Sequence, residues 1–356
     1  MRRLIFWLGY LALVLVIGLG VLTVRFLNAV GAFATVVPTH PGACIALAKV
    51  PGAEDLQIDR ANRLMFVSVR DWREIPAKPN PANGLYVMNL DQKQLGLTRL
   101  TPPSPDFHPH GLSLYIAPDG TRTLMVINHP DPAKSTVEIY DVAIGGGAAT
   151  LHHRASVSST LFAMLNDLVA VGPSQFYAAN QTSKRTPLGQ LFETVLLQPG
   201  ASVLYYDGQM PKVIARNLTL TAGIGASSDY SKIYVSDSLR SRIVTLEGNP
   251  FAGFTETSEM RVPGNPDNID VDEAGNLWVA SHLKGLALPN YAAHPDQPSP
   301  SAIYELSIAG GRLMRAVPIY VDKGGELGSA TVGAAFDGHL YIGTVYDNKI
   351  LDCVLK

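Results

Sequence analysis

The sequence predicts an all-β protein, a six-bladed β-propeller that carries one hydrophobic helix at its N-terminus. Two observations predict the propeller. A pattern of two alternating strands joined by a turn recurs six times along the chain, and 32 glycines and 25 prolines can supply the tight turns between short strands. A third observation, an unbroken apolar run near the N-terminus, predicts the helix.

The length and composition of the chain further restrict its possible domain organisation and partners. The chain has 356 residues, of which 47% are apolar and only 16% are charged. That apolar content can fill a large core, and closed β architectures reach this length as one domain. The formal net charge is −2 and no basic run is present. We therefore expect no nucleic-acid partner, because phosphate binding needs an excess of Lys and Arg.

Residues 1–34 form a segment distinct from the predicted propeller of residues 35–356. The apolar run from Leu4 to Val24 is 21 residues long, which at a rise of about 1.5 Å per residue matches a hydrocarbon core of about 30 Å. A secretory signal has a shorter apolar region. We therefore favour an uncleaved signal-anchor, with Arg2 and Arg3 inside and the globular part exported.

Two alternatives to this anchor remain open. The triplet Ala32-Phe33-Ala34 is an acceptable cleavage site for a signal peptide, which would give a secreted or periplasmic protein, and Arg25 weakens the orientation by placing a positive charge on the far side. A helix buried in the globular core is the other alternative, although the run is apolar on every face.

The six repeats begin at regular places. Each repeat reads as a strand, a turn rich in Gly or Asp, and a second strand with period-2 alternation. Intervening stretches such as STVEIYDV supply further strands, and four strands repeated six times is the pattern of a β-propeller. A pair of irregular β-sandwiches is the alternative. The repeats are separated by 56, 56, 56, 45 and 62 positions, and they begin at Glu54, His110, Asn166, Ala222, Asp267 and Ser329.

The first strand of each blade lines the channel of a propeller, so the first residues of the repeats converge on one mouth. Four of the side chains there are hard oxygen donors, namely those of Glu54, Asn166, Asp267 and Asn268. Such donors suit Ca²⁺, whereas structural zinc requires Cys and His. The alternative is that each of these residues only caps a local turn, a common use of Asp and Asn.

Histidines are the second feature of this mouth. His110 begins the second repeat and His129 ends its next strand, so antiparallel pairing brings the two rings together. A His pair beside a metal can take a proton from water. His282 ends the second strand of the fifth repeat and is a further candidate for the pocket. No nucleophile elbow, Walker loop, zinc-protease motif or dinucleotide fingerprint occurs.

The chain has only two cysteines, Cys44 and Cys353, at opposite ends of the predicted propeller. In an oxidising compartment two such cysteines can pair, which would close a loop across 309 positions. Two unrelated buried thiols are the alternative.

Several segments resemble the paraoxonase/arylesterase family. They include FHPHGLS around His110, VINHPDPAKSTVEIY around His129, LNDLVAVGPSQFYAAN around Asn166 and PDNIDVDEAGNLWVASH around Asp267, and the resemblance covers roughly residues 40–356. It implies a six-bladed propeller with two calcium ions in its channel, related to sugar-lactonase and strictosidine-synthase-like propellers. It also implies hydrolysis of lactones and aryl esters.

The resemblance also assigns roles to residues. It implies that Glu54, Asn166, Asp267 and Asn268 bind a catalytic calcium, and that His110 and His129 form a catalytic dyad. It implies a structural calcium held by Asp55, Asp167 and the backbone carbonyl of Leu112, and a disulfide that joins Cys44 to Cys353.

One position departs from the family pattern. Where the family carries an Asn ligand in an N-G-I-N-I-S segment, this chain reads Ala222-Gly-Ile-Gly-Ala-Ser. Ala222 cannot coordinate, so we expect a weakened catalytic calcium site. We predict a calcium-dependent lactonase and arylesterase that meets the membrane through its N-terminal segment. The alternatives are a non-catalytic propeller that binds a ligand or a protein, and a sugar-lactonase-like enzyme with a different metal or none.

Overall fold

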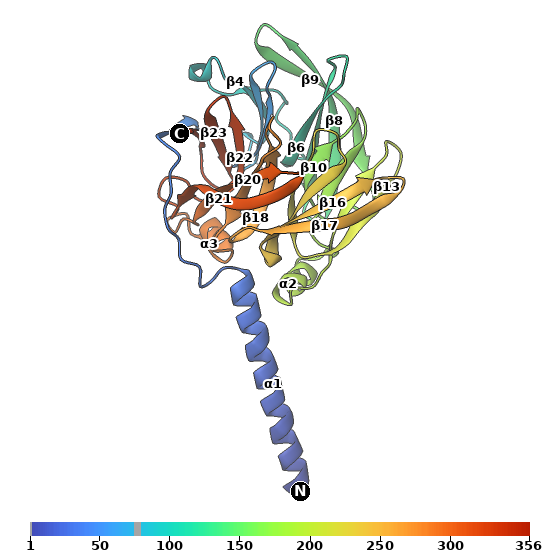
Figure 1. The fold of residues 1–356 in the computed structure, drawn as a ribbon, viewed down its shortest axis with the longest axis vertical. Coiled ribbons are helices and arrows are strands. Elements are labelled where there is room, and N and C mark those ends of the chain that lie inside the picture. Colours follow the sequence, from blue (N-terminus) through green and yellow to red (C-terminus); the bar gives the residue numbers. More distant parts are fainter. Residues whose placement is uncertain (1, 75–79) are drawn as a thin grey trace.

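The computed structural model describes residues 2–74 and 80–356, and it confirms the six-bladed propeller. Six four-stranded antiparallel sheets surround a central channel, and a single long helix projects from one side (Figure 1). In each of the first five blades the strands pair in chain order. The innermost strands are β2 (Ala53–Asp59), β6 (Pro109–Ile116), β10 (Leu165–Ala170), β14 (Thr221–Ala226), β18 (Asn265–Val271) and β22 (Ala330–Phe336).

The remaining strands lie progressively further from the channel. Second in each blade are β3 (Leu64–Val69), β7 (Arg122–Asp131), β11 (Phe176–Asn180), β15 (Lys232–Asp237), β19 (Leu277–His282) and β23 (His339–Thr344). Third are β4 (Gly84–Asn89), β8 (Lys134–Gly145), β12 (Ala201–Tyr206), β16 (Arg242–Asn249), β20 (Ser301–Ala309) and β24 (Ile350–Val354). Outermost are β5 (Thr98–Arg99), β9 (Ala148–Ser158), β13 (Pro211–Leu218), β17 (Gly253–Arg261), β21 (Arg312–Asp322) and β1 (Cys44–Ala48).

The ring is closed by its first strand. The sixth blade takes β22, β23 and β24 from the end of the chain and β1 from the beginning. Cys44 of β1 lies opposite Cys353 of β24, and the two form the predicted disulfide. The alternative of two unrelated thiols is therefore wrong. The bond links the two ends of the propeller, so the ring cannot open at its sixth blade without breaking a covalent bond.

The channel is held together by polar groups of the inner strands. Asp55 accepts a hydrogen bond from the backbone amide of Leu112 on the next blade (2.7 Å), and Asp167 accepts one from that of Ile224 (2.9 Å). Gly111 allows the close approach of neighbouring inner strands, because a Cβ at this position would lie 2.6 Å from the carbonyl oxygen of Asn166. The HGL sequence at the start of β6 thus brings His110 against the Asn166-Asp167 pair.

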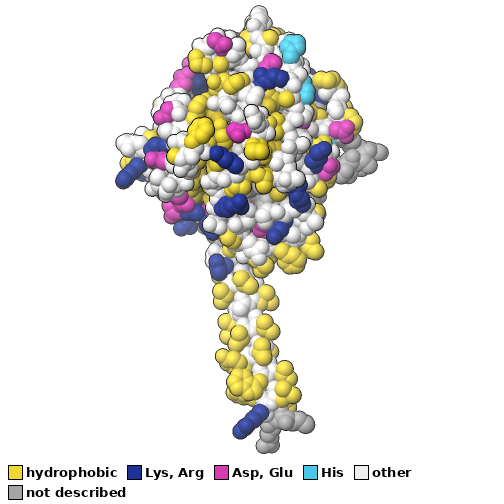
Figure 2. All heavy atoms as spheres, turned by 90° about the vertical axis from the view of Figure 1, so that its right-hand side faces the viewer, with side chains coloured by type: hydrophobic (Ala, Val, Ile, Leu, Met, Phe, Trp, Pro, Cys, Tyr) yellow, Lys and Arg dark blue, Asp and Glu magenta, His cyan; other side chains and the backbone are white. Residues whose placement is uncertain are grey.

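The N-terminal helix α1 (Arg2–Ala29) stands away from the propeller (Figures 1 and 2). The segment Arg3–Ala29 is long and apolar enough to cross a membrane, and its apolar stretch is not buried against the propeller. The alternative of a helix buried in the globular core is therefore wrong. A membrane anchor and a signal sequence both fit this helix.

Two short helices lie on the side of the propeller from which α1 projects, namely α2 (Pro187–Val195) and α3 (Ala287–Ala293) (Figure 1). Thr186 caps α2 by accepting a hydrogen bond from the amide of Gly189 (3.2 Å), and Pro187 occupies the first turn. Two single-turn 3₁₀ helices, η1 (Lys93–Leu95) and η2 (Ser238–Arg240), complete the elements.

Candidate active site

The first residues of five repeats meet at one mouth of the channel. Glu54, His110, Asn166, Ala222 and Asp267 stand on β2, β6, β10, β14 and β18, and all five line one cavity of about 210 Å³. His282, at the end of β19, lines the same cavity. The convergence predicted from the repeat is therefore present in the structure.

The predicted oxygen donors are buried and incompletely paired, and all but Asn268 line this cavity. Only 2% of Glu54 is exposed, and its Oε1 accepts a hydrogen bond from Asn268 Nδ2 (3.2 Å). Asn166 Nδ2 donates to Gln181 Oε1 (3.0 Å). Because their amino groups are held in this way, both amides leave an oxygen free. Three buried oxygens have no hydrogen-bond partner among the described residues, namely Glu54 Oε2, Asn166 Oδ1 and Asn268 Oδ1.

These free oxygens fit a hard cation. Buried polar atoms are rarely left without a partner, so three of them in one set call for a ligand. Burial, and then repulsion by Asp267, raises the pKa of Glu54 well above its usual value. No cluster of three or more His, Cys, Asp or Glu side chains with metal-binding geometry occurs in residues 2–74 and 80–356. The candidate set instead mixes two carboxylates with two amides, a mixture typical of Ca²⁺.

The residues assigned to a structural calcium lie one step further along the channel. Asp55, Leu112 and Asp167 line a cavity of about 20 Å³, room for one small ion or water. Burial raises the pKa of both aspartates, as do neighbouring carboxylates, which are Glu54 for Asp55 and Asp55 for Asp167. Leu112 contributes its amide to Asp55 here. The set is brought together as predicted, but its calcium remains a prediction.

The two histidines form a hydrogen-bonded pair. His110 Nδ1 lies 3.0 Å from His129 Nε2, and His110 Nε2 lies 3.4 Å from Glu54 Oε1. Burial, and then the charge of Arg70, lowers the pKa of His110 to about 3. Burial also lowers the pKa of His129 well below its usual value, with His110 as the next cause. Both rings are therefore neutral at neutral pH, and each has one nitrogen without a proton that can accept a hydrogen bond.

His282 and Ala222 complete the predicted residues of the cavity. His282 Nε2 lies 2.9 Å from Asp267 Oδ2, so this histidine orients one of the candidate metal-binding carboxylates. Ala222 is buried in the wall beside Leu220 and offers no side-chain oxygen. The departure seen in the sequence is thus located inside the cavity, among the candidate calcium ligands.

Several residues of the cavity were not predicted, among them Trp72, Gln181, Thr331 and Tyr346. A signal for one of them was present in the repeat. Gln181 directly follows β11, as His282 ends β19, so both occupy the channel end of a second strand. Applying the position of His282 in its blade to the equivalent position in the third blade would have predicted Gln181 as a residue of the cavity. Trp72 lies in the loop after β3, where the repeat carries no information.

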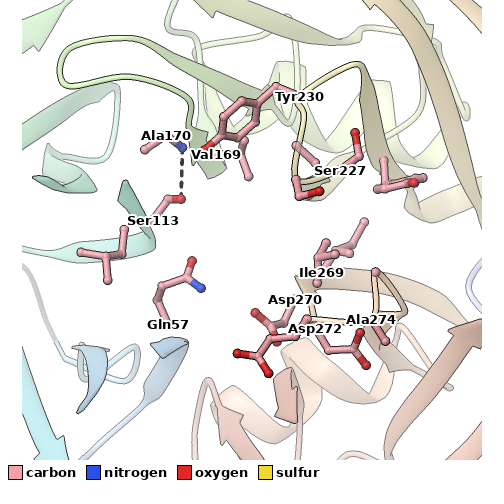
Figure 3. Close-up of a pocket in the computed structure, with 18 of the residues that line it drawn as sticks. Gln57, Ser113, Val169, Ala170, Ser227, Tyr230, Ile269, Asp270, Asp272 and Ala274 are labelled. Carbon is pink, nitrogen blue, oxygen red and sulfur yellow. Dashed lines mark hydrogen bonds between the residues drawn. The ribbon is translucent and has the colours of Figure 1, made fainter. Parts of the chain in front are cut away.

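A second and larger cavity, of about 360 Å³, opens at the other end of the channel (Figure 3). Gln57, Val169 and Ile269 line it, and each follows a residue of the candidate active site by two or three positions along its inner strand. Two of its three acidic residues are hydrogen-bonded. Asp270 contacts Arg60 (3.2 Å), and Asp272 accepts from Trp278 Nε1 (3.1 Å). The predicted oxygen donors therefore lie at the opposite mouth of the channel, together with the histidine pair.

Comparison with known proteins places this geometry in a family. A family model described as Arylesterase matches residues 28–355, nearly the whole propeller. The chain belongs to the arylesterase family. Human "Serum paraoxonase/arylesterase 2" is 31% identical to it over 314 residues, covering 85% of this chain and 86% of that protein. "Serum paraoxonase/lactonase 3" of Oryctolagus cuniculus is 29% identical, covering 93% and 94%.

Solved structures of more distant proteins share the fold of this arylesterase-family chain. A structure titled "Luciferin-regenerating enzyme" superposes with a TM-score of 0.54 at 15% sequence identity, covering 88% of this chain and 95% of that one. At that identity the likeness supports the propeller architecture alone. The resemblance noticed in the sequence is confirmed by the family match, and its curated relatives bear names of arylesterases and a lactonase.

Proposed function

We propose that this protein is a calcium-dependent hydrolase of lactones and aryl esters. The observation that carries the proposal is the set of three unpaired buried oxygens, on Glu54, Asn166 and Asn268, beside a neutral histidine pair. The relatives named for arylesterase and lactonase activity support the same reaction class.

Glu54, Asn166, Asp267 and Asn268 would hold the catalytic calcium, and Asp55 and Asp167 the structural one. When bound, Ca²⁺ polarises the substrate carbonyl and stabilises the oxyanion that develops on it. The structural site would relieve the repulsion between two buried carboxylates and so stiffen the channel.

The tautomers of the dyad decide which nitrogen can act as a base. His129 Nδ1 lies 3.3 Å from Ser135 Oγ, a hydroxyl that can accept a hydrogen bond, and we propose that His129 Nδ1 carries the proton and donates it to this hydroxyl. Its Nε2 must then accept from His110 Nδ1–H. This leaves His110 Nε2 without a proton and facing Glu54, in position to take one from a water in the cavity. His129 acts as a positioning residue.

Ala222 favours one alternative function, that of a non-catalytic binding protein. A chain that lacks one oxygen ligand could have lost catalysis and kept a ligand-binding or protein-binding role. Three candidate donors, Glu54, Asn166 and Asp267, line one cavity with His110, however. Asn268 and His129 stand behind them, in hydrogen-bond contact with Glu54 and His110, and water can complete the coordination of Ca²⁺. We therefore place hydrolysis first and non-catalytic binding second. A sugar-lactonase-like enzyme with another metal is separated from both by metal analysis.

We further propose that α1 is retained as a membrane anchor with the propeller exported. The end of α1 is built into the propeller near the active site. Asn265 Nδ2, whose side chain lines the catalytic cavity, donates to the carbonyl of Ala29 (2.7 Å), and the amide of Gly285 donates to that of Val30 (2.8 Å). Cleavage after Ala34 would remove both partners. These contacts support the anchor over the cleaved signal.

One experiment tests the proposed function. The full-length protein in detergent is stripped of metal and titrated with Ca²⁺ by calorimetry, and hydrolysis of phenyl acetate and δ-valerolactone is followed in the same samples. We expect hydrolysis to rise with calcium occupancy and to be abolished in His110→Gln. Calcium binding without hydrolysis of a panel of esters and lactones would favour the binding protein, and activation by Zn²⁺ or Mn²⁺ but not Ca²⁺ would favour the sugar-lactonase-like enzyme.

A further inference from the structure

One wall of the catalytic cavity is an aromatic residue that the mechanism does not use. Trp72 lies in the loop after β3 and lines the cavity beside Glu54 and His110. Its ring packs edge-on against His110, with ring centroids 4.7 Å apart and an interplanar angle of 66°. A group bound for attack by a water next to His110 must therefore pass close to the indole.

Arg70 holds this indole in place. Its guanidinium carbon lies 4.1 Å from the centroid of the Trp72 ring, a cation–π contact. Glu74 Oε1 lies 3.7 Å from Arg70 Nε, beyond hydrogen-bond distance. Glu74 is in turn fixed by His108, whose Nδ1 lies 2.8 Å from the same oxygen. The order along this wall is thus Glu74, Arg70, Trp72 and His110.

Two donors in this wall are unused. Trp72 Nε1 and Arg70 Nε are buried and have no hydrogen-bond partner among the described residues. A buried donor without a partner is unfavourable, and Trp72, unlike Arg70, lines the substrate cavity, so its unpaired indole N–H points to an acceptor on the ligand.

We infer that Trp72, positioned by Arg70, is a specificity-determining residue that binds a second acceptor oxygen of the substrate. This rests on the proposed function. The preferred substrate is an ester or lactone whose substituent carries a carbonyl oxygen within reach of the indole N–H. The apolar side chains of Leu220, Leu288 and Val345 line the same cavity and accommodate the hydrocarbon part of that substituent.

The test compares two δ-lactones of equal chain length, one with a keto group in its side chain and one without. In the calcium-loaded full-length protein we expect a higher kcat/KM for the keto lactone. Trp72→Phe keeps an aromatic ring and removes the N–H, so the preference should fall about fivefold, the effect of one neutral hydrogen bond. Arg70→Met should reduce the preference in the same direction by releasing the indole.

Trp278→Phe is the matched control, because the Trp278 indole N–H is already bonded to Asp272 and lies outside the catalytic cavity. It should leave the preference unchanged. An equal preference in the wild type and in both Trp72→Phe and Arg70→Met would overturn the inference. If neither lactone is hydrolysed, the proposed function fails, and dissociation constants of the two lactones measured by calorimetry then decide the inference. Equal or undetectable binding of both would overturn it.

Discussion

Replacing Glu54 with Gln should have opposite effects on stability in the absence and presence of calcium. The Glu54 carboxylate is buried, its Oε2 has no partner among the described residues, and Asp267 repels it. Glu54→Gln removes the charge and keeps an oxygen to accept from Asn268. In chelator at pH 7 the variant should therefore be more stable than the wild type, by about 1–3 kcal/mol for one uncompensated polar group.

Calcium should reverse this order. A ligand that binds only the folded state stabilises it by about 2.7 kcal/mol at roughly one hundred times its dissociation constant. The wild type should gain this amount, and Glu54→Gln should gain much less because it lacks one of two carboxylate ligands. The gain from the structural site is common to both proteins and cancels in the comparison.

Urea unfolding of the full-length protein in detergent, with chelator and with saturating calcium, measures both effects. Two results would refute the reasoning. A wild type more stable than Glu54→Gln in chelator would mean that the buried charge is already compensated. An equal calcium gain in both proteins would mean that Glu54 is not a ligand.

Three further predictions follow from the same structure. Replacing Cys44 and Cys353 with Ser releases a loop across 309 positions and should lower the free energy of unfolding by about 5–6 kcal/mol in the chain-entropy model, as measured in urea. The pKa of His110 is lowered to about 3, so between about pH 6.5 and 3 this histidine binds a proton in the unfolded chain but not in the folded chain. Without calcium, the stability of the wild type relative to His110→Gln should therefore fall by about 1.6 kcal/mol in total as the pH drops from 6.5 to 5. Ala222→Asn should tighten calcium binding several-fold by titration calorimetry, and unchanged affinity would show that position 222 does not face the ion.

The repeat made much of this fold predictable. A period-2 alternation with turns fixes which strands exist, and the geometry of a propeller then places Glu54, Asn166 and Asp267 together without any knowledge of loops. The antiparallel neighbours His110 and His129 could be paired for the same reason, and the structure brings them into hydrogen-bond contact.

What the repeat could not predict comes from segments between blades. Trp72 and Arg70 occupy a connection whose path depends on tertiary contacts, and no periodicity specifies such a path. The docking of the end of α1 was also missed. It depends on hydrogen bonds between Asn265 and Ala29, 236 positions apart, and a pattern within one window of sequence cannot report them.

The closure of the ring has a consequence for biosynthesis. The sixth blade needs β1, which precedes all the other strands along the chain, and β24, which follows them all. During translation the growing chain can therefore assemble its first five sheets, but the ring stays open until β24 has emerged. The disulfide between Cys44 and Cys353 can form only after that point. Its formation thus reports closure of the ring, and a chain interrupted before β24 would expose the edge of β23 and leave an unpaired thiol at Cys44.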